Sequence, residues 1–217
     1  IMAGGQNIGI ELSSDGILIV GLYDVGSESP AREAKLKTGD KIVSINDTNV
    51  SSIKEMLDII SKIEKPNSIK IGYVRANSNE TTTLNLVMDN DNIYKTGLYV
   101  KDSITGVGTL TFIDPNSKIY GALGHEIIEK STGQKLEIKD GKIYSSTVTG
   151  ITPSNEGDPG EKNARYDTNN VFGNIKENSS SGIFGEYTAS LPENKLYKVA
   201  KPEEVKTGAA SILTVTN

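Results

Sequence analysis

The stretch Ile119–Ile127, which reads IYGALGHEI, carries the only histidine of the chain, His125. The unperturbed pKa of histidine suits proton transfer near neutral pH, so His125 is a candidate general base. Gly121, Ala122 and Gly124 leave room for other backbone near the imidazole, and the apolar residues beside them predict a strand entering a core. A second interpretation stays open, in which the imidazole is a satisfied structural group in an apolar strand.

Several other chemistries are not expected from this composition. The 217 residues include one histidine, no cysteine and no closely spaced set of carboxylates, so we predict no metal site, no disulfide and no thiol nucleophile. Nothing suggests a cofactor. The net charge is −5, from 23 basic and 28 acidic residues without a basic cluster, which argues against nucleic acid as a partner.

A hairpin is predicted to position His125. The turn sequence DPNSK at Asp114–Lys118 has proline at its second position and polar residues around it. It joins a strand over Thr105–Ile113 to a returning strand over Ile119–Ile127, which puts His125 near the far end of the hairpin. Other short strands are expected, and together they favour a barrel or sandwich. They are Leu98–Ile104, Leu136–Ile138, Lys142–Val148, Val171–Ile175, Gly182–Tyr187 and Glu204–Thr216.

The first part of the chain combines strands with two helices. A helix over Ile53–Ile63 is indicated by Ile53, Met56, Leu57 and Ile60, which fall on one apolar face, and by Ser51 or Ser52 as its cap. The other expected elements are strands over Gly4–Leu12, Gly16–Leu22, Asp40–Ile45, Ser68–Arg75 and Thr81–Met88, a short helix over Pro30–Leu36, and a hairpin turn over Asn77–Glu80.

Residues 4–88 resemble bacterial PDZ domains, in the sequence SPAREAKLKTGDKIVSINDTNVSS. By this resemblance, GQNIGI is the loop whose backbone N–H groups bind the terminal carboxylate of a peptide. The peptide then adds as a strand beside Ile8–Leu12, against the helix that begins at Ile53. The alternative is that the apolar residues are simply core. The predicted peptide-binding residues are Gln6, Asn7, Ile8, Gly9, Ile10, Ile53, Met56 and Ile60.

The second part resembles the stage IV sporulation protein B (SpoIVB) peptidases of spore-forming Firmicutes, in the stretches GVGTLTFIDPNSKIYGALGHEI, GDPGE and KTGAASILTV. The resemblance implies a mainly β fold, with an α+β PDZ domain over residues 1–88 and part of a trypsin-like β-barrel peptidase domain over 89–217. It implies a serine endopeptidase of the Ser–His–Asp type. His125 matches the catalytic histidine of the family.

The same resemblance implies a cellular role. Such peptidases act between the forespore and mother-cell membranes, where they cleave themselves and a membrane-bound regulator of an intramembrane protease, which activates a late sigma factor. The PDZ domain is expected to regulate self-cleavage or substrate recognition. No run of about 18 apolar residues occurs, so anchoring is expected through a segment outside this chain, whose opening IMAGGQ looks internal.

The chain departs from the family in its nucleophile. The family serine lies in a G-x-SGSP-like motif beyond the stretch Lys206–Thr214, and the acid also lies beyond it, so we expect residues 1–217 to be inactive alone. Ser179–Gly182 lacks the glycine pattern of a nucleophile loop. Four aspartates read as turn residues, Asp114, Asp140, Asp158 and Asp167. A non-catalytic PDZ-containing binding or regulatory module, with the barrel as scaffold, remains the alternative.

Overall fold

The computed structural model describes residues 1–63, 67–135, 137–157 and 160–213 and divides into two compact units. The helix unit comprises residues 13–103 and 128–139, and the strand unit comprises residues 1–12, 104–127 and 140–217. The fold is mainly β, as predicted. The predicted division at residues 88 and 89 follows chain order, whereas the compact units interleave along the sequence, so the domain limits stay a prediction.

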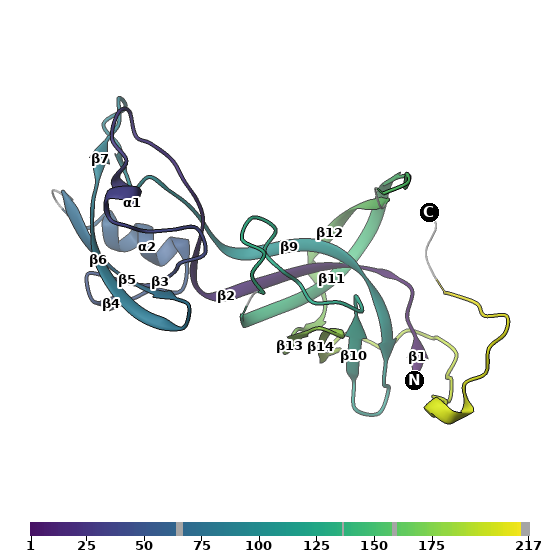
Figure 1. Ribbon diagram of the computed structural model, residues 1–217. Coiled ribbons are helices and arrows are strands. Elements are labelled where there is room, and N and C mark those ends of the chain that lie inside the picture. Colours follow the sequence, from purple (N-terminus) through teal and green to yellow (C-terminus); the bar gives the residue numbers. More distant parts are fainter. Residues whose placement is uncertain (64–66, 136, 158–159, 214–217) are drawn as a thin grey trace. The chain divides into compact units, whose positions relative to one another are not determined.

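Figure 1 labels most of the elements. No helix of the described residues is long and apolar enough to cross a membrane. The helices are α1 (Pro30–Glu33), α2 (Ile53–Ile60) and the 3₁₀-helix η1 (Pro202–Glu204). The strands are β1 (Met2–Ala3), β2 (Asn7–Leu22), β3 (Lys41–Ile45), β4 (Thr48–Asn49), β5 (Ser68–Arg75), β6 (Ser78–Asn85), β7 (Val87–Met88), β8 (Tyr94–Lys95), β9 (Leu98–Ile113), β10 (Ile119–Ala122), β11 (Ile138–Thr152), β12 (Glu161–Asn174), β13 (Glu177–Ser179) and β14 (Gly182–Glu186).

In the helix unit, strands pair in the order β2–β3–β5–β6, and β4 pairs with β3. The predicted hairpin is confirmed, but its turn lies at Ala76 and Asn77, whose φ angles of 46° and 65° form a two-residue loop. The strands therefore run on to Arg75 and from Ser78, and the predicted turn over Asn77–Glu80 is too late in the chain. Buried aliphatic residues from these strands and both helices form one core.

Helix α2 is capped by three side chains. Ser52 accepts the N–H of Glu55 (3.2 Å), and the carboxylate of Glu55 accepts the N–H of Ser51 (2.7 Å), as in a capping box. Asp102 of β9 accepts the N–H of Ile53 (2.8 Å). The helix ends at Ile60 rather than at the predicted residue 63, because the backbone there tightens into three-residue turns.

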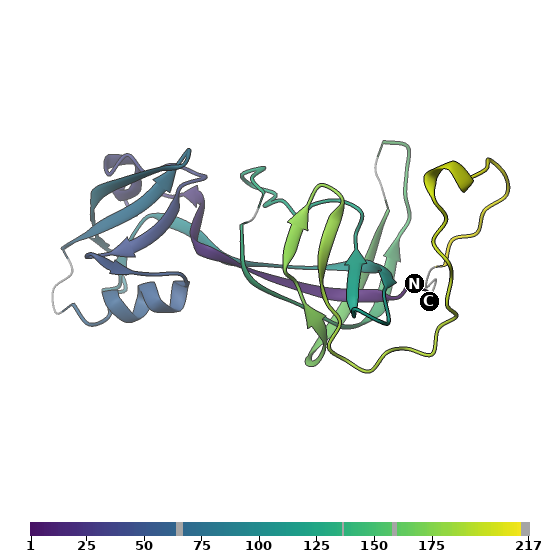
Figure 2. The ribbon, with the colours of Figure 1, turned by 90° about the horizontal axis from the view of Figure 1, so that it is seen from below.

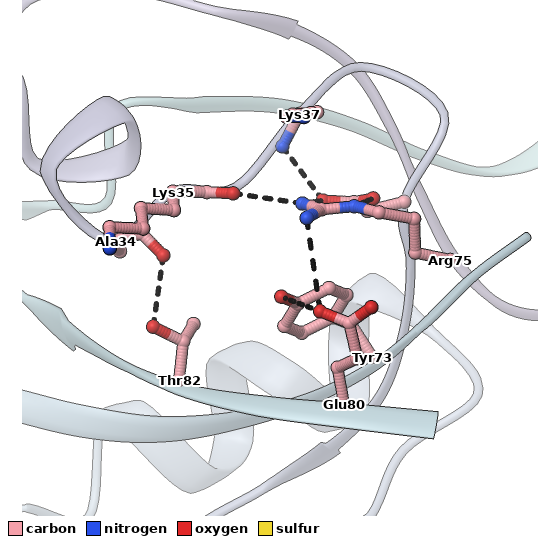
Figure 3. A network of polar contacts seen from close by, with 8 residues as sticks. Ala34, Lys35, Lys37, Tyr73, Arg75, Glu80 and Thr82 are labelled. Atoms are coloured by element: carbon pink, nitrogen blue, oxygen red, sulfur yellow. Dashed lines mark hydrogen bonds and ion pairs between the residues drawn. The ribbon is translucent and has the colours of Figure 1, made fainter. Parts of the chain in front are cut away.

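Asp40, the aspartate of the GD pair in the PDZ-like motif, has a structural role in a network that includes Lys37, Tyr73 and Arg75 (Figure 3). Asp40 is 1% exposed, and its carboxylate accepts the N–H of Lys37 (2.7 Å) and two guanidinium N–H groups of Arg75 (2.7 and 2.6 Å). Arg75 also donates to the carbonyl of Lys35 (2.8 Å) and lies over the ring of Tyr73. Because the Asp40 carboxylate accepts these hydrogen bonds, the pKa of Arg75 is raised and the guanidinium stays charged. Arg75 thereby connects the loop after α1 to β5.

The strand unit is a curled sheet, a half-barrel, in which β13, β14, β10 and β9 pair in sequence (Figure 2). β1 also pairs with β9, and β11 pairs with β12 and β2. Two pairs of predicted strands are single strands: β2 runs through Gly16, whose φ is 120°, and β9 runs through Ile104. Both strands contribute residues to the two units. Within Glu204–Thr216, residues 205–213 form no strand, and the predicted strand over Leu136–Ile138 begins outside the described residues.

Tyr144 of β11 hydrogen-bonds to Glu11 near the start of β2. This contact predicts that the stability of the strand unit depends on pH. The Tyr144 hydroxyl donates to the carboxylate of Glu11 (2.7 Å), and burial together with that carboxylate raises the pKa of Tyr144 to about 12. An unfolded tyrosine loses its proton near pH 10, so the folded chain binds more protons between pH 10 and 12. Its free energy of unfolding is therefore expected to fall over that range.

The expected loss attributable to Tyr144 is up to about 3 kcal/mol, at about 1.4 kcal/mol per pKa unit. Urea unfolding at pH 9 and at pH 11.5 measures it, and Tyr144→Phe should make the decline shallower. Tyr197→Phe, in an exposed position, is the matched control. An equal decline in the wild-type chain and in Tyr144→Phe would show that Tyr144 does not titrate in this way.

Candidate functional site

His125 lies just past the end of β10, after the hairpin that β10 forms with β9. The hairpin turn forms as predicted, because the Asp114 carboxylate accepts the hydroxyl of Ser117 (2.7 Å) and the N–H of Asn116 (3.0 Å). These hydrogen bonds lower the pKa of Asp114. The prediction of a strand as far as Ile127 is wrong, since β10 ends at residue 122.

The strand ends because the next two residues leave the β region. Leu123 and Gly124 have φ angles of 73° and 83°, and this left-handed conformation is unusual for leucine. Gly108 of β9 makes room for the displaced leucine: a Cβ on Gly108 would lie 2.3 Å from Cδ2 of Leu123. The chain therefore turns away after Ala122 and leaves His125 exposed.

The imidazole lines a depression of about 690 Å³, here called the His125 hollow. Its walls are the glycine-rich stretch 105–109 of β9, the β12 residues Lys162 and Tyr166, and Asn7 at the start of β2. His125 is exposed, whereas Asn7 is 8% exposed. The imidazole is thus exposed and lies past the end of the apolar strand, and its role as a base stays a prediction.

A backbone carbonyl orients the imidazole. Nδ1 of His125 lies 3.0 Å from the carbonyl oxygen of Glu126. A carbonyl oxygen accepts hydrogen bonds and cannot donate them, so Nδ1 carries the proton in this bond. In the neutral ring, Nε2 then holds the free lone pair. This is the tautomer that a general base needs when Nε2 removes a proton from a nucleophile.

Among the described residues, no serine or threonine hydroxyl and no carboxylate forms a hydrogen bond with His125. Ser179 is part of the turn between β13 and β14, where its hydroxyl donates to the carbonyl of Gly182 (3.1 Å). The single hydrogen bond of the imidazole goes to a backbone carbonyl, and in the described part of the chain no carboxylate accepts from it. No group of three potential metal ligands occurs among those residues either.

The residues predicted to bind a peptide fall in different units. Gln6 to Ile10 belong to the strand unit, where Ile8 and Ile10 are buried. The backbone just before them is occupied by β9: Gly5 donates to the carbonyl of Leu110 (2.7 Å), and Leu110 donates to the carbonyl of Gln6 (3.0 Å). These groups are therefore already paired with β9 in the sheet. The assignment of a carboxylate-binding loop here stays a prediction.

The three helix positions lie in the helix unit. Met56 is buried in its core, and Ile53 and Ile60 pack against that core, which also contains Leu98 of β9. Asp102, further along β9, makes the hydrogen bond to the first turn of α2 described above. A segment of the same chain thus contacts the helix predicted to line the groove.

A close contact leaves no room for a side chain at Gly9. A Cβ at Gly9 would lie 2.2 Å from Cβ of Tyr166, which stacks on Tyr144. Gly9→Val is therefore expected to lower the free energy of unfolding by about 1–3 kcal/mol through overpacking. Gly106→Ala is the matched control, since nothing lies within 4 Å of the Cβ it would add. Urea unfolding compares them, and equal stability of the two variants would contradict this contact.

One residue near the site gave no signal in the sequence. Asn178 of β13 is 6% exposed and hydrogen-bonds to both backbone polar groups of Ile127, two residues after His125. The two residues are 51 positions apart, so no local pattern connects them. The nearby stretch Ser179–Gly182 contains the serines considered as a nucleophile, and its described contacts are those of a hairpin turn.

Comparison with known proteins identifies both parts of the chain. The family model described as SpoIVB peptidase S55 matches residues 92–217, and that of the PDZ domain matches residues 7–86. Two solved structures are similar, each a PDZ domain of an SdrC-like protein. The one from Listeria monocytogenes is 25% identical and covers 42% of this chain and 93% of its own, with a TM-score of 0.35. The one from Listeria innocua is 26% identical and covers 40% and 93%, with a TM-score of 0.34. No curated protein gave a significant match.

Proposed function

The chain belongs to the SpoIVB peptidase S55 family and includes a PDZ domain, and from this premise we propose that it is part of a serine endopeptidase in which His125 is the general base. The observation that carries the proposal is the state of the imidazole. It is exposed in a hollow, its Nδ1 is held by the carbonyl of Glu126, and Nε2 is left with the lone pair.

The proposed reaction is hydrolysis of a peptide bond by acyl transfer. Nε2 of His125 removes the proton of a serine hydroxyl as the serine oxygen attacks the scissile carbonyl, and the imidazolium then gives the proton to the leaving amine, which leaves an acyl-enzyme. A water molecule, deprotonated by His125, attacks the acyl carbonyl, and the imidazolium returns the proton to the serine oxygen as the carboxylic acid product leaves. We propose that the serine and the acid come from the family's G-x-SGSP-like region and its acidic residue, outside residues 1–217. Residues 1–217 alone would then be inactive.

The proposed substrates are proteins. By the role of the family, they include the peptidase itself and a membrane-bound regulator of an intramembrane protease in the space between forespore and mother cell, with activation of a sigma factor as the result. The PDZ domain would select them by adding a peptide strand to its sheet. These roles rest on family membership, and the anchoring membrane segment would lie outside this chain.

A fluorophosphonate probe tests the chemistry on the full-length protein that contains this chain. The probe modifies a serine only when a neighbouring base activates it. We expect labelling of the wild-type protein and none of His125→Ala. Equal labelling of both would exclude His125 as the base, and absence of labelling in the folded wild-type protein would favour the alternative, a non-catalytic PDZ-containing binding module.

A further inference from the structure

The hairpin of β13 and β14 contacts the segment that carries His125 at both of its ends. At the first end, β14 pairs with β10 as far as Ala122, opposite Ile183. The backbones approach so closely there that a Cβ on Gly182 would lie 2.4 Å from the carbonyl oxygen of Ala122. The φ of Gly182, 130°, also favours glycine at this position.

At the second end, the side chain of Asn178 in the same hairpin makes the hydrogen bonds that the backbone of a neighbouring strand would otherwise make. Oδ1 of Asn178 accepts the N–H of Ile127 (2.7 Å), and Nδ2 of Asn178 donates to the carbonyl of Ile127 (2.8 Å). A carboxamide presents an acceptor and a donor in one plane, so it can satisfy both backbone groups of a residue at once. Asn178 is 6% exposed, and water therefore competes little for these bonds.

The hydrogen bond of His125 and one hydrogen bond of Asn178 involve the same peptide group. The carbonyl of Glu126, which accepts from Nδ1 of His125, and the N–H of Ile127, which donates to Asn178, belong to the same peptide bond. That bond is planar, so fixing its N–H also fixes the direction of its carbonyl. Hydrogen bonds on the two sides of one peptide group polarise each other in the same sense.

We propose that Asn178 is a positioning residue for His125, acting through the peptide group between Glu126 and Ile127. It holds the Glu126 carbonyl where the carbonyl accepts from Nδ1–H, and the lone pair on Nε2 stays free. Leu123 and Gly124 have left-handed backbone conformations, so the chain has left the strand before His125. Regular strand geometry therefore does not set the orientation of the imidazole. The catalytic meaning of this contact rests on the proposed function, whereas the contact itself does not.

The test uses the fact that His125 is the only histidine, so that one imidazole appears in the nitrogen-15 spectrum of the chain. We expect the wild-type ring to show the Nδ1–H tautomer. Asn178→Ala should convert it to a mixture of tautomers. Asn178→Asp should retain most of the wild-type pattern, because a carboxylate oxygen can still accept the N–H of Ile127. Asn174→Ala is the matched control, since the Asn174 side chain accepts the N–H of Glu186 in β14 and its described hydrogen bonds involve none of residues 122–127.

An unchanged imidazole spectrum in folded Asn178→Ala would overturn the proposal, as would an equal change in Asn174→Ala. A pH titration of the wild-type chain decides the matter if Asn178→Ala does not fold. The side-chain amide signals of Asn178 and the N–H signal of Ile127 should then shift together with the imidazole, and independent titration would also overturn the proposal.

Labelling of the full-length protein separates this inference from the proposed function. We expect Asn178→Ala to lower the fluorophosphonate labelling rate about 10- to 100-fold, as a misplaced catalytic group does. If Asn178→Ala changes the tautomer but the wild-type protein is never labelled, the positioning role stands and the result counts against the peptidase. Normal labelling of Asn178→Ala alongside a changed tautomer would show that the contact does not serve catalysis.

Discussion

Under the proposed mechanism, replacing His125 with alanine is expected to lower kcat/KM of the full-length protein by at least about 10⁴-fold, because the nucleophilic serine would then have no base. The loss should appear in kcat, since the imidazole acts on the reacting atoms and not on substrate binding. Peptide hydrolysis measured across substrate concentrations separates the two constants. His125 is exposed, so the free energy of unfolding should change by no more than about 0.5 kcal/mol.

The control for this prediction is Arg165→Ala. Arg165 is exposed on β12 beside Tyr166, but it does not line the His125 hollow. Its removal should leave kcat/KM within about twofold, as expected for an exposed residue away from the reacting atoms. Retention of full activity by His125→Ala would remove the basis of the proposed mechanism. A loss of equal size in Arg165→Ala would show that the assay reports on charge or folding instead.

Replacing Asp40 with alanine is expected to destabilise the helix unit by about 3–5 kcal/mol, which is the cost of breaking a buried ion pair by removing one partner. The side chain of Arg75 is 26% exposed and would keep its charge without the carboxylate that now receives two of its N–H groups. The N–H of Lys37 would lose its acceptor as well. Urea unfolding of the whole chain, followed by circular dichroism, measures the loss.

A second ion pair in the same unit gives the comparison. Asp47 pairs with Lys70, but its side chain is 76% exposed, so Asp47→Ala should cost less than about 1 kcal/mol. The double variant Asp40→Leu/Arg75→Met should be more stable than Asp40→Ala, because it leaves no buried charge unpaired. Glu80, which also pairs with Arg75 (3.8 Å), is 41% exposed and can be solvated. Equal costs for Asp40→Ala and Asp47→Ala would contradict a buried role for the network in Figure 3.

The candidate site was predictable where it depends on residue type and short spacing. A single histidine, the DPNSK turn and the strand before it were enough to place His125 at the far end of a hairpin. The type of turn follows from Asp114, which satisfies the backbone of the next few residues through its own carboxylate. The Ser52 cap of α2 was predictable for the same reason.

The conformation of the site was not predictable in this way. Small and apolar residues around His125 suggested a continuous strand, but the packing of Leu123 over Gly108 ends it early and exposes the imidazole. Asn178 and Ile127 are far apart in the sequence, and no local pattern distinguishes Asn178 from any other asparagine in a hairpin. The close approach of Tyr166 to Gly9 was not predictable either, because the two residues are far apart in the sequence.

Residue patterns were enough to predict the mainly β character, the PDZ-like order of elements, the family resemblance and the one side chain suited to proton transfer. These depend on local preferences and on short patterns, which act within a few residues. The folded chain adds three features that no local pattern contains: β2 and β9 are single long strands, the two compact units interleave along the sequence, and Asn178 reaches the peptide group beside His125. Those features depend on strand register and on contacts between distant residues, which are selected by packing of the whole chain.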